Sequence, residues 1–354
     1  MLEKKTVGST PADLSGTPLP GPSAYRPGLR RFAGARGSAS RIFRRFRNRC
    51  FLDLAGDHRG NLLIVGSGRS GTTWLAELVN AGNDYRVIFE PFSWRHVSQS
   101  SAFHSRQYLR PGESSQVHLD TARIILNGNL STPWVDSRNH RYVCRGRLIK
   151  EIRANLFLSW LLVNFPGMRV VFLIRHPCAY ALSRVRQGFD VDGMLHDMLA
   201  QPALVADFLE PHLGFMKSLN SPFEKHVFQW CVEQAVPLAT VPSDEFFPLF
   251  YEELCATPER SFQGLLTHIG RASIEFPTLD FGRPSSTTRP WSAVGHGQDP
   301  ASAWVSEVSS ASVKRAMEIL SRFTLDGLYD EGPRPHREIL QELQGRGQET
   351  IPRR

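Results

Sequence analysis

The chain of 354 residues lacks a hydrophobic run long enough to cross a membrane. A transmembrane helix needs about 18 or more consecutive apolar residues. The longest apolar run, around Leu156–Phe165, is interrupted by Asn164 and followed by Pro166. The N-terminus also lacks the apolar core of a signal peptide. We therefore expect a cytoplasmic protein without a transmembrane segment.

Cysteine is scarce and shows no paired spacing. The five cysteines are odd in number, widely separated and without a C-x-x-C pair: Cys50, Cys144, Cys178, Cys231 and Cys255. This distribution favours free thiols in a reducing compartment over a disulfide framework or a zinc site.

Acidic residues are absent between Asp13 and Asp53, where arginine is frequent. Residues 1–60 hold twelve Lys/Arg and four Asp/Glu, so this segment accounts for the whole formal net charge of +8. Because residues 1–55 are rich in Gly, Pro, Ser and Arg, we predict a disordered basic arm. The remainder is neutral and shows no basic stripe, so we expect no nucleic-acid partner.

Within this arm, residues 40–54 place apolar side chains at helical spacing among arginines, which predicts a basic amphipathic helix. One interpretation is peripheral contact of residues 26–54 with an anionic membrane or another acidic polymer. A helix packed on the folded domain and an organelle transit peptide are the alternatives.

The most informative segment is Asn61–Glu77. Residues 62–65 form a continuous apolar run typical of a strand buried on both faces, and residues 72–78 have the composition of a helix start. The glycine-rich turn 66–71 joins them. Unpaired backbone N–H groups and the helix dipole converge at such a junction, which therefore predicts an anion-binding loop.

The spacing of this loop indicates which anion it binds. Gly66 and Gly71 fit the glycine frame of the nucleoside-triphosphate loop G-x-x-x-x-G-K-[ST], but Thr72 stands where that motif requires Lys. The lysine grips the β- and γ-phosphates during phosphoryl transfer. We therefore expect the loop to bind a phosphate other than the γ-phosphate of ATP.

Two motifs follow predicted strands. The first is RSGTTW at Arg69–Trp74; in the second, Arg175 follows the apolar run 169–174 and Ser183 comes eight positions later. The first resembles the 5′-phosphosulfate loop of sulfotransferases that use 3′-phosphoadenosine-5′-phosphosulfate (PAPS), and the second resembles their 3′-phosphate motif. His176 stands where that family more often has Asp or Asn.

Weaker matches extend the resemblance over residues 60–330, which we interpret as one sulfotransferase domain followed by a polar tail, 331–354. The matching segments are Phe89–Phe92 (F-E-P), Lys150–Arg153 (K-x-x-R), Tyr251–Leu254 (similar to Y-E-D-L) and Asp299–Trp304 before a last helix. The pattern is nearest to carbohydrate-type and bacterial members. It favours a small-molecule or glycan acceptor, with a saccharide or glycoconjugate preferred.

Apolar strands alternate with helices along this domain. The alternation predicts an α/β fold with a mostly parallel central sheet and helices on both faces, as in P-loop NTPases. The expected strands are 62–65, 86–89, 141–149, 169–174 and 246–251. The expected helices are 72–81, 151–164, one from Ala179, 259–269 and 309–323. Further helical segments are expected around 193–218 and 223–238, and residues 93–140 are interpreted as a long polar stretch. Ligand groups gather at the carboxyl ends of parallel strands, where four candidates fall: Arg69, Glu90, Lys150 and Arg175.

The resemblance implies in-line transfer of a sulfuryl group from PAPS to a hydroxyl or amine. The nucleotide-binding residues that it implies are Arg69, Ser70, Gly71, Thr72, Thr73, Trp74, Arg175 and Ser183. Arg69 would also balance charge on the leaving phosphate, and Trp74 would lie against adenine or pack in the core. Lys150 would grip the sulfuryl group or the acceptor, or only extend from its strand end. Because a sulfuryl group carries one charge, fixed donors suffice and we expect no metal.

Glu90 is the candidate general base, because it follows an apolar strand end where burial raises the pKa of a carboxylate towards neutrality. Its alternative role is an ion pair with an arginine, such as Arg69. His96 and His104 are the alternative bases.

Other functions remain open from the sequence. An ATP-dependent P-loop kinase would need a loop lysine and a magnesium-binding Asp, and a non-catalytic relative would keep only the nucleotide pocket. Segments 93–140 and 187–223 are expected to form the acceptor cleft. Three aromatic residues there would stack on sugar rings or belong to the core: Trp94, Tyr108 and Trp134.

Overall fold

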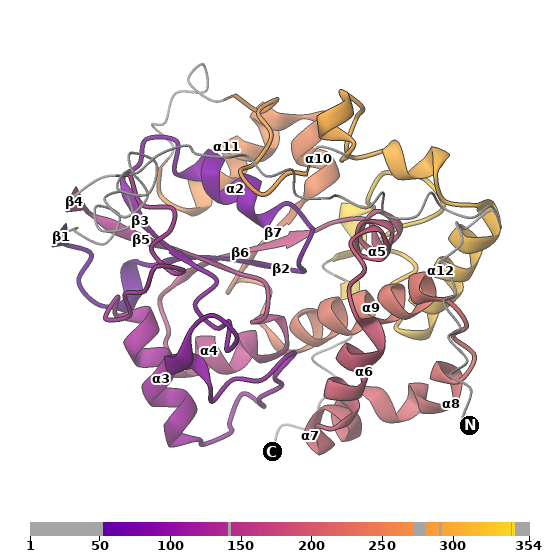
Figure 1. The fold of residues 1–354 in the computed structure, drawn as a ribbon, viewed down its shortest axis with the longest axis horizontal. Helices are drawn as coiled ribbons and strands as arrows, with labels where there is room; N and C mark the ends of the chain where they lie inside the picture. Colours follow the sequence, from indigo (N-terminus) through magenta and orange to yellow (C-terminus); the bar gives the residue numbers. More distant parts are fainter. Residues whose placement is uncertain (1–51, 141–142, 272–279, 290–291, 341, 344–354) are drawn as a thin grey trace, which may run out of the picture.

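The computed structural model describes residues 52–140, 143–271, 280–289, 292–340 and 342–343. At its centre is a five-stranded parallel sheet in the order β3-β5-β2-β6-β7 (Figure 1). Its strands are β2 (Leu62–Gly66), β3 (Tyr85–Phe89), β5 (Gly146–Glu151), β6 (Arg169–Ile174) and β7 (Phe247–Phe250). The predicted α/β fold with a parallel sheet is therefore confirmed.

Helices cover both faces of the sheet (Figure 1). Ile64 of β2 packs in one hydrophobic cluster and Val65 in the other, because successive side chains of a strand point to opposite faces. One face carries α2 (Thr72–Val79), α10 (Tyr251–Ala256) and α11 (Pro258–His268). The other carries α3 (Gln116–Leu126), α4 (Leu158–Asn164), α5 (Pro177–Arg186), α9 (Pro222–Thr240) and α12 (Ser310–Arg322). The short helices α6 (Val191–Leu199), α7 (Pro202–Leu204) and α8 (Leu213–Met216) follow α5.

Two expected elements differ from the structure, whereas the helical segments expected around 193–218 are present as α6, α7 and α8. The polar stretch 93–140 contains α3, which buries only a narrow face that includes Ala122 and Ile125. The expected helix 151–164 begins late, at Leu158 after a 3-10 turn, because Glu151 ends β5 and its buried carboxylate accepts hydrogen bonds from the next two backbone N–H groups.

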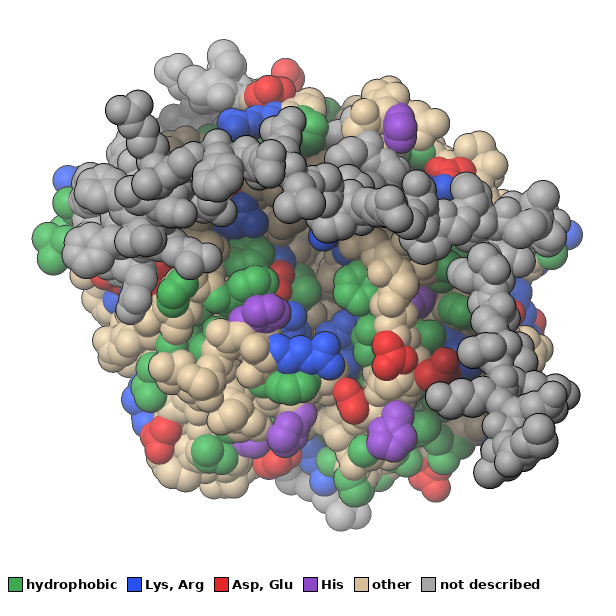
Figure 2. All heavy atoms as spheres, viewed as in Figure 1, with side chains coloured by type: hydrophobic (Ala, Val, Ile, Leu, Met, Phe, Trp, Pro, Cys, Tyr) green, Lys and Arg blue, Asp and Glu red, His purple; other side chains and the backbone are tan. Residues whose placement is uncertain are grey.

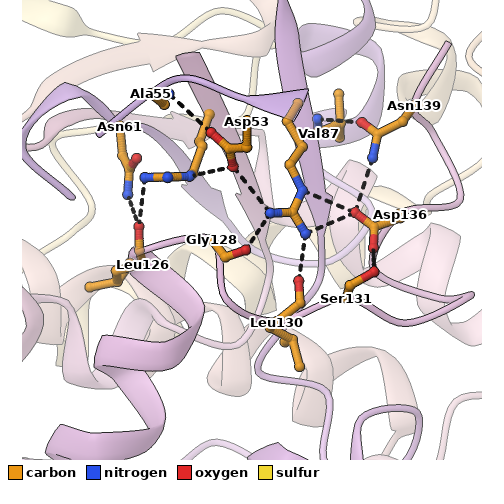
Figure 3. A network of polar contacts seen from close by, with 12 residues as sticks. Asp53, Ala55, Asn61, Val87, Leu126, Gly128, Leu130, Ser131, Asp136 and Asn139 are labelled. Carbon is orange, nitrogen blue, oxygen red and sulfur yellow. Dashed lines mark hydrogen bonds and ion pairs between the residues drawn. The ribbon is translucent and has the colours of Figure 1, made fainter. Parts of the chain in front are cut away.

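A buried ionic network ties the start of the described chain to the amino ends of β3 and β5. Arg86 donates from Nη1 to Asp53 Oδ2 at 3.1 Å and from Nε to Asp136 Oδ1 at 3.1 Å, while Arg147 Nε donates to Asp53 Oδ2 at 2.7 Å. Figure 3 shows Asp53 and Asp136 on either side of this network, with the Gly128 carbonyl accepting from below. These two arginines are thus neutralised far from the carboxyl ends of the strands.

Leu52–Asp53 forms strand β1, which pairs in parallel with β4 (Val143–Cys144). The amphipathic helix expected over 40–54 is therefore wrong for these two residues, and most of that segment lies outside the described residues. The disordered arm and the membrane contact of residues 26–54 likewise stay predictions. None of the helices in the described ranges is long and apolar enough to span a membrane.

The packed structure continues beyond residue 330. Tyr329 and Pro335 form an antiparallel bridge, a 3-10 turn follows at Arg337–Ile339, and the side chains of Leu340 and Leu343 are buried. The folded part therefore includes the first residues of the segment expected to be a polar tail.

Candidate active site

The glycine-rich loop after β2 is shaped by close backbone approach. A Cβ at Gly66 would lie 2.5 Å from the Leu173 carbonyl oxygen, and one at Gly71 would lie 2.6 Å from the Tyr251 ring. Gly71 also has a φ of 94°, in the left-handed region that glycine adopts without strain. Both glycines are therefore required by the path of the loop, which brings it against β6 and Tyr251.

This loop presents unused hydrogen-bond donors at the N-terminus of α2. The first turn of α2 has no acidic residue and no side-chain cap. The hydroxyl of Ser70 is buried and has no partner among the described residues. A helix N-terminus with unpaired N–H groups and a buried hydroxyl is suited to an anion.

The two phosphate motifs meet in space. Arg69 Nε donates to Ser183 Oγ at 3.3 Å, and Arg175 Nη1 donates to the Arg69 carbonyl at 2.9 Å. The Arg175 guanidinium lies 4.4 Å from the centre of the Tyr251 ring, and its Nε is buried without a partner in the described ranges. Burial lowers the pKa of Arg69, and the charge of Arg175 lowers it further. Within the described chain, neither arginine forms an ion pair with a carboxylate, so their positive charge is left for a ligand.

His176 follows Arg175 and caps the N-terminus of α5, the helix that carries Ser183. Its Nδ1 accepts from the Cys178 backbone N–H at 3.2 Å, and its own backbone N–H donates to Glu252 at 2.8 Å. The ring is buried and stacks on Trp304 with 4.1 Å between centroids. Burial lowers the pKa of His176 to about 3, so the ring is neutral and caps the helix as an acceptor. A neutral histidine thus supplies the hydrogen bond that Asp or Asn can supply at such a position.

Glu90 lies in a buried ionic cluster at the carboxyl ends of β3 and β5. Its Oε1 accepts from Lys150 Nζ at 2.5 Å and its Oε2 from Arg153 Nη1 at 2.9 Å. Burial favours the neutral acid, but Lys150 and Arg153 outweigh it and hold the pKa of Glu90 below its ordinary value. The expectation of a raised pKa is therefore wrong for this arrangement, and the partners of Glu90 are these two residues rather than Arg69.

Lys150 is 2% exposed, and its ammonium also lies 4.9 Å from the centre of the Phe89 ring. Burial lowers its pKa, while Glu90 acts in the opposite direction. The interpretation of Lys150 as a side chain that only extends to water from its strand end is therefore wrong.

Glu90 has a φ of 43°, an unusual backbone conformation for a residue with a side chain. Such conformations are frequent at functional sites.

One cleft of about 940 Å³ joins these clusters. The candidate residues that line it are Arg69, Gly71, Thr72, Thr73, Trp74, Glu90, Lys150, Arg175 and Ser183. Ser70 is buried beneath the loop. Trp74 packs edge-on against Tyr251 with 5.5 Å between ring centroids. On the face shown in Figure 2, Lys and Arg side chains gather in a hollow near the centre.

Both segments expected to form the acceptor cleft contribute to its lining. Trp94 and Arg106 come from 93–140, and Phe189 and Met194 come from 187–223. Tyr108 is instead buried, with its hydroxyl donating to Asp207 at 2.8 Å. The remaining candidates, His96, His104 and Trp134, are not among the lining residues, and the rings of His96 and Trp134 stack on each other 3.8 Å apart.

Among the lining residues that were not candidates from the sequence are Arg153, Arg184 and Tyr251. Arg153 and Tyr251 belong to segments already noted, K-x-x-R and the Y-E-D-L-like segment, so a signal for them existed. Arg184 directly follows Ser183, and nothing in its spacing indicates a ligand.

Of the cysteines in the described ranges, Cys255 lines the cleft. Cys144, Cys178, Cys231 and Cys255 are free thiols, and Cys50 lies outside the described residues. Cys178 is buried, which raises the pKa of its thiol. Within the described ranges, no three His, Cys, Asp or Glu side chains are grouped as metal ligands.

Comparison with known proteins gives the family. The profile of the sulfotransferase family matches residues 61–275, more than half of the chain. This chain therefore belongs to the sulfotransferase family, whose members are enzymes. No curated protein matches it.

Solved structures give distant likenesses. The sulfotransferase domain of the Synechococcus PCC 7002 olefin synthase is 17% identical, with 80% of this chain and 96% of that chain covered and a TM-score of 0.43. The sulfotransferase domain from the curacin biosynthetic pathway is 14% identical, with 77% and 99% covered and a TM-score of 0.38. A sulfotransferase from Alicyclobacillus acidocaldarius is 12% identical, with 74% and 96% covered and a TM-score of 0.35.

Proposed function

We propose that this sulfotransferase binds PAPS in the cleft and transfers its sulfuryl group to a hydroxyl or amine of a small-molecule or glycan acceptor. The observation that carries the proposal is the contact between the two phosphate motifs. Arg69 and Arg175 bring two positive charges without acidic partners in the described ranges, beside a loop with unused donors. PAPS has phosphate groups at its 3′ and 5′ positions, and the two motifs offer one subsite for each.

On the nucleotide side, the loop and the N-terminus of α2 would hold the 5′-phosphate, and Arg175 with Ser183 would hold the 3′-phosphate. Nη1 and Nη2 of Arg175 donate only to backbone carbonyls, those of Arg69 and Pro300. Hydrogen bonds to an ionised phosphate are about twice as strong as those between neutral groups. Trp74 and Tyr251 together offer an aromatic surface for adenine.

On the transfer side, Glu90 would accept the proton of the acceptor while Arg69 stabilises the negative charge that develops on the leaving phosphate. Glu90 is already ionised, because Lys150 and Arg153 lower its pKa. In the reaction Lys150 would turn from Glu90 to the sulfuryl oxygens. That movement removes one of the two charges that hold the pKa of Glu90 down, and so strengthens Glu90 as a base when the sulfuryl group is in place.

A saccharide is the acceptor class that we favour. Trp94 is 38% exposed and lines the cleft, so its ring is available to pack against a sugar. Tyr108 and Trp134 are engaged with other side chains and do not serve this purpose.

Replacing Arg175 by Ala tests the nucleotide assignment. The affinity for 3′-phosphoadenosine-5′-phosphate (PAP) should fall by about 10- to 100-fold, because charge-assisted hydrogen bonds contribute about 1.5–3 kcal/mol each. The affinity for AMP, which lacks only the 3′-phosphate, should change little. Isothermal titration of both nucleotides measures the difference. Arg169→Ala, at the exposed opposite end of β6, is the matched control, and Ser183→Ala should act as Arg175→Ala does, but more weakly. Equal loss for both nucleotides would exclude a 3′-phosphate subsite at Arg175.

Removal of divalent metal distinguishes sulfuryl transfer from the kinase alternative. Transfer of sulfate from PAPS should persist in excess EDTA, because the proposed stabilising groups are Arg69, Lys150 and backbone N–H donors. A strict magnesium requirement, together with phosphate transfer from ATP, would support the kinase instead.

A further inference from the structure

Beyond the nucleotide motifs, the cleft runs along a wall formed by α5, α6 and the segment that contains Arg106. Arg184 lies in this wall. It directly follows Ser183 on α5, lines the cleft and is only 3% exposed. A buried guanidinium is costly unless a counter-charge or a full set of acceptors compensates it.

The hydrogen bonds of Arg184 within the described part of the chain reach no carboxylate. Its Nε donates to His226 Nδ1 at 3.3 Å, and its Nη2 lies 2.9 Å from Met194 Sδ, a weak acceptor. The guanidinium also lies 4.2 Å from the centre of the Phe189 ring. Burial lowers the pKa of His226 to about 4, so this partner is neutral. In the described part of the chain, Arg184 forms no ion pair.

Two buried carboxylates of this region are paired with other arginines. Glu233 forms an ion pair with Arg106, and Glu90 forms one with Arg153. Burial lowers the pKa of Arg184 and the charges of Arg106 and Arg153 act in the same direction, whereas Tyr180 and Glu233 raise it. Arg184 therefore lies among other cations, an arrangement that an anionic ligand would stabilise.

Arg184 lies beside the start of the glycine-rich loop, and its charge lowers the pKa of Arg69. A Cβ at Gly68, the residue before the RSGTTW motif, would lie 3.6 Å from Arg184 Nη1 and 3.2 Å from Ile152 Cδ1. Arg184 therefore borders the loop at Gly68, whereas Ser183, the residue before it on α5, accepts from Arg69 Nε. Phe189 and Met194, which surround the guanidinium, belong to the acceptor wall.

We propose that Arg184 binds a negatively charged group of the acceptor, a carboxylate, sulfate or phosphate, and that the preferred acceptor is therefore anionic. This inference rests on the proposed function of the cleft. Arg153 lies near both Arg184 and Glu90. Its charge lowers the pKa of Arg184, and its guanidinium donates to Glu90 at 2.9 Å. The anionic group would thus be held beside the hydroxyl that faces Glu90.

Steady-state kinetics with matched acceptor pairs test this inference. Each pair differs in one charged group, for example 4-nitrophenyl glucuronide against 4-nitrophenyl glucoside, with corresponding phenol and lipid pairs. The wild-type enzyme should prefer the charged member. Arg184→Gln should raise KM for the charged member by about 10- to 100-fold. It should leave KM for the neutral member and the Kd for PAP unchanged. Arg184→Lys should restore part of the preference for the charged member.

The matched control is Arg186→Gln, because Arg186 lies on the same helix and lines the cleft but forms an ion pair with Glu307. It should keep the preference for the charged acceptor. Equal losses for both members of a pair, or no preference in the wild-type enzyme, would overturn the inference while leaving sulfate transfer from PAPS intact. A fall in PAP affinity would instead assign Arg184 to the nucleotide.

A measurement of ligand-induced stabilisation tests the same inference without turnover and without the acceptor pairs. With PAP saturating, glucuronate should raise the Tm of the wild-type protein more than glucose does at equal ionic strength. The Arg184→Gln variant should lose this difference. If glucuronate stabilises both proteins equally, the anion binds elsewhere, for example at Lys150, and the inference is wrong.

Discussion

Replacing Glu90 by Gln is expected to lower turnover by about 10²–10⁴-fold, the usual contribution of a positioned general base. Glutamine keeps the shape of the side chain and one of the two acceptor oxygens that Lys150 and Arg153 use, but it cannot take the proton of the acceptor. The affinity for PAP should stay nearly unchanged, because Glu90 lies at the carboxyl end of β3 and not in either phosphate motif. Single-turnover rates with PAPS and titration with PAP measure the two quantities.

A purely structural role for Glu90 predicts a different result. Thermal stability and nucleotide affinity would then fall together. Turnover would fall only as far as the loss of folded, nucleotide-bound enzyme explains. Glu151→Gln is the matched control, since Glu151 is also buried and also accepts from Arg153, at 3.4 Å, but is not among the residues that line the cleft. It should lower stability without a loss of rate as large as that of Glu90→Gln. Near-normal turnover in Glu90→Gln would move the search for the base to His96 and His104.

Replacing Lys150 by Met should lower turnover by about 10²–10³-fold, comparable to removing one donor that stabilises charge in a transition state. Methionine keeps the apolar stem over the Phe89 ring but removes the ammonium that is proposed to move to the sulfuryl oxygens. PAP lacks the sulfuryl group, so its affinity should change little.

Lys150→Arg separates charge from geometry. It keeps the positive charge, but its planar fork is wider than an ammonium in a position that is 2% exposed, so partial activity is expected. If Lys150→Met retains full turnover, Lys150 serves only to hold Glu90. If the variant loses PAP affinity instead, Lys150 contacts the nucleotide.

Spacing along the chain was enough to predict the local structure of the two motifs that we propose to bind the nucleotide. Gly66 and Gly71 are required by the turn between β2 and α2, and the spacing from Arg175 to Ser183 joins a strand end to the next helix. Both join residues that are close in the sequence, so they can be recognised without knowledge of the tertiary structure. The order of the predicted strands and helices also gave the parallel sheet.

The surroundings of Glu90 could not be predicted, because they depend on the order of the strands in the sheet. β3 lies beside β5 with Phe89 in register with Lys150, which brings Glu90 next to Lys150 and Arg153. The sequence contains the segments that form β3 and β5 but does not show that they are adjacent. The predicted direction of the pKa shift of Glu90 was therefore wrong. The same holds for Arg184, whose lack of an acidic partner depends on α6 and α9 packing around it.

Transfer of radiolabelled sulfate from PAPS, measured with purified protein in EDTA across a panel of glycan, phenol and lipid acceptors, tests the central claim most directly. We expect label in at least one acceptor with the wild-type protein. We expect a large loss with Glu90→Gln at saturating PAPS, and a loss with Arg175→Ala that saturating PAPS largely restores. No label in any acceptor, with PAP and AMP bound equally well by the wild-type protein, would contradict a PAPS-dependent sulfotransferase site in this cleft.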